Sequence, residues 1–147
     1  MSRVVDLRGP VRLASALVLV VPLFCAQSLL LTEIKAEHDP GKRSEKALSL
    51  ADSAFENARD DYNKGQINKG DAELENMMTA LEECLSSLDT AHKARNYKKA
   101  EMNVATLQRR MKGLLDDIAV QQRGWAEYTQ RKLDQLHDKL LDGVMRK

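Results

Sequence analysis

Hydrophobic residues recur every three or four positions over most of the chain after residue 43, which is the spacing of one helix face. The first stripe runs from Ala47 to Tyr62 and consists mainly of alanines. It predicts a helix with Ser44 as its N-cap and Gly65 as its C-terminal stop. Because alanine side chains are small, this face should allow a neighbouring helix to approach closely.

The second stripe is the most regular in the chain and extends from Leu74 to Ala91. Asn68, followed three residues later by Asp71, predicts a capped start for this helix. Cys84 falls on the apolar face, so we interpret it as a small buried hydrophobic residue rather than as a nucleophile.

Two further stripes complete the pattern, from Tyr97 to Ile118 and from Trp125 to Val144. Asn96 is the expected N-cap of the third helix, and Gly113 interrupts that helix. Residues 119–124 are expected to form the turn before the fourth helix.

Four amphipathic helices joined by short connections pack as antiparallel neighbours. We therefore predict an all-α fold, with an up-down-up-down four-helix bundle over residues 44–147. Residues 37–43 (EHDPGKR) are expected to be a polar linker. Composition agrees, because aromatic residues make up only 4% of the chain, and it holds only 7 glycines and 3 prolines.

The N-terminal segment has the pattern of an export signal. Arg3, Arg8 and Arg12 precede an apolar run from Leu13 to Leu31, and a positive region followed by an apolar stretch directs a chain across a membrane. We therefore expect residues 1–36 to be a signal peptide or membrane anchor, and the protein to be periplasmic or otherwise extracytoplasmic.

Three fates remain open for this segment after export. Cleavage after Ala36 would release a soluble protein starting at Glu37. Retention is the second possibility, because the apolar run approaches the roughly 20 residues that span a bilayer. In the third, Cys25 would carry a lipid, although Phe24 stands where a lipoprotein signal has a small residue.

Charge and motifs exclude several classes of function. Residues 1–36 hold four basic and two acidic residues of the chain's 23 and 22, so the remainder has one net negative charge, which argues against nucleic-acid binding. There is no glycine-rich phosphate loop, nucleophile elbow or haem-attachment motif. We expect no enzyme activity and no cofactor.

One set of residues could still bind metal. Asp89 and His92 are three residues apart on the second expected helix, and Asp134 and His137 repeat this spacing on the fourth. Such pairs, with a carboxylate from each of the other helices, resemble the di-metal sites of ferritin-like bundles. The other carboxylates would be Glu45 or Asp52, and Glu101. The alternative is that both pairs are solvated residues on helix shoulders, because those sites use the longer Glu.

The methionines and two aromatic residues each allow two interpretations. Met77, Met78, Met102 and Met111 could ligate haem or copper together with a histidine, or they could fill the core.

Trp125 and Tyr128, at the start of the fourth helix, could pack across the end of the bundle. Otherwise they would form a partly exposed aromatic patch for a protein partner.

Two stretches resemble known helical repeats. Residues 54–72 (AFENARDDYNKGQINKGDA) resemble a tetratricopeptide helix hairpin, and residues 92–101 (HKARNYKKAE) repeat part of that pattern. The whole chain is also similar to small uncharacterised exported helical proteins of bacteria. These resemblances imply tetratricopeptide-like hairpins and a periplasmic location.

The sequence thus predicts a non-enzymatic extracytoplasmic helical bundle that acts through protein–protein contacts, either with itself or with another protein. The alternative is a metal- or cofactor-binding bundle that uses Asp89 with His92 and Asp134 with His137. Membrane contact is expected only through Leu13–Leu31, if that run is not cleaved.

Overall fold

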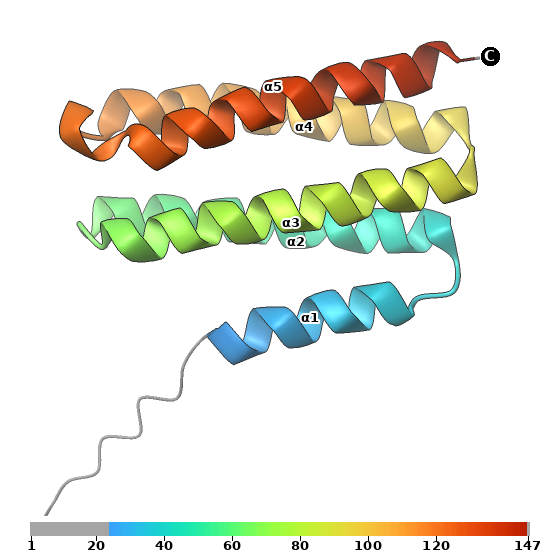
Figure 1. Cartoon of the computed structure of the whole chain (residues 1–147), viewed down its shortest axis with the longest axis horizontal. Helices are drawn as coiled ribbons and strands as arrows, with labels where there is room; N and C mark the ends of the chain where they lie inside the picture. The colour runs from blue at the N-terminus through green and yellow to red at the C-terminus, as the bar shows by residue number, and fades with distance from the viewer. Residues whose placement is uncertain (1–23, 147) are drawn as a thin grey trace, which may run out of the picture.

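A computed structural model describes the backbone of residues 24–146 and the side chains of residues 29–146. This part of the chain is all-helical and has no strand, which confirms the predicted fold class. It consists of five α-helices and one short 3₁₀ helix, and the α-helices are labelled in Figure 1. In chain order they are α1 (Phe24–Ala36), α2 (Pro40–Asn63), α3 (Ile67–Ala91), α4 (Ala94–Asp117), η1 (Val120–Gln122) and α5 (Gly124–Met145).

Successive helices run in opposite directions (Figure 1). The closest pairs are the two hairpins α2–α3 and α4–α5, which stack so that α2 contacts α4 and α3 contacts α5. Helix α1 lies along the α2–α3 hairpin. The short connections favour this alternation of direction, because the chain must reverse at once after each helix.

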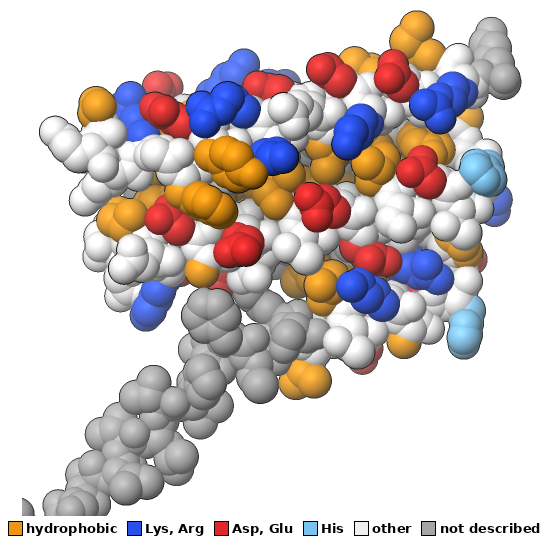
Figure 2. Space-filling view, viewed as in Figure 1, with side chains coloured by type: hydrophobic (Ala, Val, Ile, Leu, Met, Phe, Trp, Pro, Cys, Tyr) orange, Lys and Arg blue, Asp and Glu red, His pale blue; other side chains and the backbone are white. Residues whose placement is uncertain are grey.

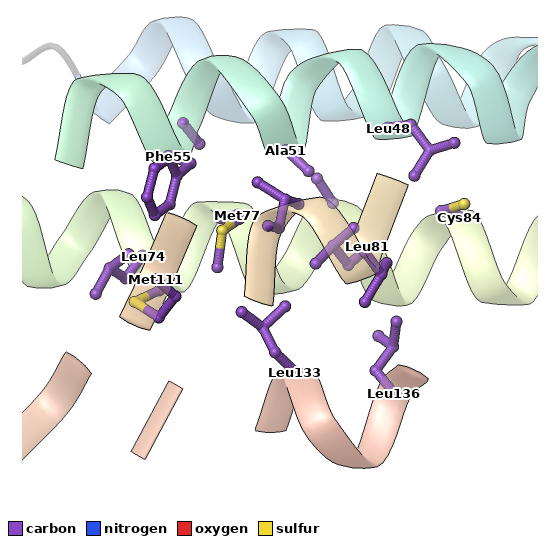
Figure 3. Packing of buried hydrophobic residues seen from close by; sticks show 14 of the residues in the cluster. Leu48, Ala51, Phe55, Leu74, Met77, Leu81, Cys84, Met111, Leu133 and Leu136 are labelled. Atoms are coloured by element: carbon purple, nitrogen blue, oxygen red, sulfur yellow. The ribbon is translucent and has the colours of Figure 1, made fainter. Parts of the chain in front are cut away.

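Apolar side chains from α2, α3, α4 and α5 meet in one core (Figure 3). Phe55, Leu74, Met111 and Leu133 contribute from the four helices and are almost completely buried. The alanine face of α2 is buried as predicted, and its small side chains allow α3 to approach closely. These are its members: Ala47, Ala51, Ala54 and Ala58.

Cys84 lies in this core with 2% of its surface exposed. Burial away from water raises the pKa of its thiol to about 12. The interpretation of Cys84 as a small buried hydrophobic residue is confirmed.

The prediction that α2 begins after Ser44 is wrong. Its N-cap is Asp39, whose Oδ1 accepts hydrogen bonds from the backbone N–H groups of Gly41 (2.8 Å) and Lys42 (3.3 Å). An Asp cap followed by Pro40 at the first helical position is a strong start signal, and it acts five residues earlier than Ser44. Ser44 lies inside the helix and donates to the Gly41 carbonyl at 2.7 Å.

The two other predicted N-caps are also wrong. Helices α3 and α4 begin before Asn68 and Asn96, at N-cap residues Gln66 and Lys93 that make no side-chain capping bond. Packing against the neighbouring helix therefore sets these two starts. By contrast, Gly65 ends α2 as predicted, and its backbone φ of 72° suits glycine.

Helix α1 is tied to the rest of the fold at its C-terminal end. Ile34 is 6% exposed and belongs to the core. The Glu37 carbonyl accepts two hydrogen bonds from the Arg43 guanidinium, at 2.9 and 2.7 Å, and the Glu37 carboxylate pairs with Lys46 at 2.7 Å. The connection between α1 and α2 is therefore short and held in place.

Most of the apolar run Leu13–Leu31, together with Arg3, Arg8 and Arg12, lies outside the described residues, so its role in export stays a prediction. Within residues 24–146, no helix combines the length and the hydrophobicity needed to cross a bilayer.

Candidate functional site

A groove between α3 and α5 places aromatic side chains at the surface. Trp125 and Tyr128 on α5 are 40% and 41% exposed, and their ring centroids are 5.2 Å apart. The α3 wall of the groove is formed by Glu75, Met78, Thr79 and Glu82. Of the two interpretations of the aromatic pair, the observed exposure favours the surface patch.

The rotation of α5 explains why these rings are exposed. Ala126, Thr129 and Leu133 point into the core, and Thr129 donates a hydrogen bond to the Trp125 carbonyl at 2.9 Å. Trp125 and Tyr128 are each adjacent in sequence to one of these buried positions. They therefore occupy the shoulder of the helix, where one side of each ring faces α3 and the other faces solvent.

The groove has an acidic edge. Glu75 and Glu82 are exposed, and neither carboxylate forms an ion pair within the described part of the chain. Lys132 lies with its ammonium nitrogen 5.6 Å from the centroid of the Tyr128 ring. With two glutamates against one lysine, the lining carries one net negative charge. Figure 2 shows hydrophobic side chains along the seam between α3 and α5, with acidic side chains beside them.

The first predicted metal-binding pair is not directed at a common point. Asp89 accepts a hydrogen bond from the Tyr97 hydroxyl at 2.6 Å. Burial, followed by this bond to a carboxylate, raises the pKa of Tyr97 to about 12. His92 is the exposed C-cap of α3, in the left-handed conformation with φ of 50°.

The second pair contributes one residue to a polar contact between α4 and α5. His137 Nε2 lies 3.1 Å from Glu101 Oε1, and Glu101 Oε2 pairs with Lys98 at 2.8 Å. The Lys98 ammonium, and then His137, hold the pKa of Glu101 below its usual value against the opposing effect of burial. Asp134 is occupied separately, accepting from Gln108 at 2.7 Å and Gln130 at 3.0 Å.

The structure therefore brings together two of the expected ligands, Glu101 and His137. The other two carboxylates form ion pairs between α2 and α4, Glu45 with Lys99 at 2.8 Å and Asp52 with Arg110 at 2.7 Å. Among the residues that the structure describes, no three His, Cys, Asp or Glu side chains are grouped as a metal site requires. The metal-binding function stays a prediction, and a metal site here would have to include Glu101 and His137 among its ligands.

The four methionines divide by position. Met77 and Met111 are in the core, as their helical spacing predicts, and Met78 is half-buried in the groove. Met102 is 59% exposed on α4.

Sequence reasoning missed Arg110. Its guanidinium lies 4.6 Å from the centroid of the Phe55 ring and pairs with both Asp52 and Glu56 on α2. These partners are more than fifty residues away in sequence, so no local pattern could have indicated them. Glu101, by contrast, lies beside the predicted core positions Ala100 and Val104, and its burial could have been expected from that spacing.

This chain matches no model of a known protein family, no curated protein and no solved structure.

Proposed function

We propose that this protein is a non-enzymatic, exported helical protein that acts through protein–protein contacts. In this proposal α2 to α5 form an up-down-up-down bundle with tetratricopeptide-like hairpins, and the segment containing Leu13–Leu31 directs export. The observation that carries the proposal is the α3–α5 groove, where two adjacent aromatic rings are about 40% exposed.

The composition of the groove favours protein binding. Trp and Tyr are enriched at protein interfaces because they provide a large contact area with little loss of side-chain entropy, and Met adapts to irregular surfaces. Unpaired carboxylates at the edge of the groove would select a partner by charge.

Site-specific photo-crosslinking in the native host tests the proposed contact. A photoreactive amino acid in place of Tyr128 is expected to give a discrete protein adduct. The same residue in place of Lys139, which is exposed on α5 outside the groove lining, should give none. Equal labelling from both positions, or no adduct from position 128, would contradict the proposed function.

Export can be measured separately. A reporter enzyme that is active only outside the cytoplasm, fused after Arg146, should be active with the native N-terminus. Activity should be lost when Val18, Leu19 and Val20 are replaced by Asp, because charges in the apolar run block membrane insertion. Full activity of this variant would exclude Leu13–Leu31 as the signal.

A further inference from the structure

We propose that the occupant of the α3–α5 groove is the outer face of α4 in a second copy of this chain, so that the protein self-associates head to tail. This inference rests on the proposed function, because it names the partner of the same groove.

The outer face of α4 carries a regular basic stripe. Its members follow heptad spacing along the helix, and we call them the α4 stripe: Lys98, Met102, Ala105, Arg109 and Lys112. Met102 is 59% exposed in the middle of otherwise basic surroundings. Side chains at these positions lie along one face of the helix.

The charges of the α4 stripe are largely available to a partner. Lys98 is paired with Glu101, whereas Arg109 donates only to the Thr106 hydroxyl, at 3.2 Å. No carboxylate pairs with Arg109 or Lys112 within the described part of the chain. With Glu101 included, this face carries two net positive charges, against the net negative charge of the groove.

The two surfaces also match in spacing. Glu75 and Glu82 are seven residues apart on α3, and Met102 and Arg109 are seven residues apart on α4. Both intervals correspond to two helical turns, about 10.5 Å. Met102 can therefore lie against the Trp125 and Tyr128 rings, a favourable sulfur–aromatic contact, while Arg109, two turns further along α4, reaches one of the two glutamates.

The arrangement of the helices makes the contact heterologous. The groove lies between α3 and α5, which are the two helices in front in Figure 1, whereas α4 lies behind α5. The α4 stripe and the groove share no residue. A contact between two different surfaces leaves one of each free on a dimer, so association continues into rings or open chains.

Complementary variants of the protein, purified in the form that its host produces, test this inference. The groove variant is Glu75→Lys with Glu82→Lys, and the stripe variant is Met102→Glu with Arg109→Glu; all four positions are exposed, so the helices should form normally. The control carries Asp60→Lys and Glu127→Lys, which are exposed positions in neither surface. Association is measured by sedimentation velocity over a range of concentrations, with circular dichroism as the check on folding.

We expect the unchanged chain and the control to associate, and each surface variant to associate at least about tenfold more weakly, because the charge pairs become repulsive. An equimolar mixture of the two variants should associate again, since the groove variant keeps its α4 stripe and the stripe variant keeps its groove. Trp125 is the only tryptophan, so its emission should shift to shorter wavelength as the groove is covered.

A chain that remains monomeric at every concentration, or variants that associate as well as the control, would overturn the second copy as occupant. Failure of the mixture to associate would do the same. If photo-crosslinks from position 128 then reach a different protein, the proposed function stands and only this inference fails. If they reach none, both fail.

Discussion

Among the side chains that the structure describes, Glu101 is the one Asp, Glu, Lys, Arg or His that is buried. A carboxylate loses its hydration on burial, so it stays charged only if hydrogen-bond donors replace the water. Lys98 and His137 supply one donor to each carboxylate oxygen. Glu101 therefore joins α4 to α5 through His137, at a point where a hydrophobic residue would have been expected.

Replacing Glu101 with Gln should lower the free energy of unfolding by about 1–3 kcal/mol at pH 7, because the charge-assisted bonds are lost. The pKa of Glu101 is lowered in the folded protein. Its contribution is thus fully present above the unfolded value of about 4.3 and disappears as pH falls through the lower folded value. Urea unfolding of both proteins between pH 7 and pH 3 should show the difference shrinking at acid pH.

Lys98→Gln is the matched control for this experiment. Its side chain is exposed, so its loss should lower stability by less than about 1 kcal/mol. A difference between the Glu101→Gln and unchanged proteins that stayed constant down to pH 3 would show that the ionised carboxylate does not stabilise the fold.

At the scale of the elements, each hairpin packs a tyrosine ring against a glycine of the partner helix. In α2–α3, a Cβ atom on Gly70 would lie 2.9 Å from the Tyr62 ring. In α4–α5, a Cβ atom on Gly143 would lie even closer to the Tyr97 ring and would overlap with it. The hydroxyls of the two tyrosines donate to Asp71 and Asp89, respectively, and these bonds hold the rings in position.

Gly70→Ala and Gly143→Ala should each lower the free energy of unfolding by about 1–3 kcal/mol, because the added methyl group overpacks a fixed ring. Gly113→Ala is the control, since its Cβ would meet no atom within 4 Å. That substitution should stabilise the protein by about 0.5–1 kcal/mol, because alanine favours a helix more than glycine does. Thermal unfolding of the three variants gives the comparison, and the same sign of change in all three would contradict the proposed close packing.

On the scale of the whole molecule, α1 is the shortest of the α-helices that contribute to the core. Among its described side chains, Ile34 is the most buried, and it packs onto the α2–α3 hairpin near the half-buried Leu50. Cleavage after Ala36 would remove Ile34 but leave Glu37, which binds Arg43 and Lys46. The long helices would then keep their own contacts while a small apolar surface on α2 became exposed.

A chain beginning at Glu37 should therefore remain folded. Its free energy of unfolding should be lower than that of a chain beginning at Phe24 by about 1.5–3 kcal/mol, which is the value of burying one isoleucine. Urea titration of both chains measures this difference. Ile34→Ala in the longer chain should reproduce most of the loss. If Ile34→Ala had no effect, the packing of α1 against α2 would contribute no stability.

The repeating apolar positions by themselves determined that the chain is helical and where most of its core residues lie. Leu74, Leu81 and Leu88 share a face because the helix repeats every 3.6 residues, whatever surrounds it. Gly65 could likewise be predicted as the end of α2, since its positive φ is a local requirement. Such features depend only on neighbouring residues along the backbone.

Only the tertiary structure decided where α3 and α4 begin, because packing between helices outweighs the weak preference of Asn68 and Asn96 for the cap. It also decided that His137, and not His92, lies beside Glu101, and that Trp125 and Tyr128 face the groove. These outcomes depend on how far each helix is rotated and shifted against its neighbours. Rotation and shift are set by all the packed side chains together, so the periodicity within one helix cannot specify them.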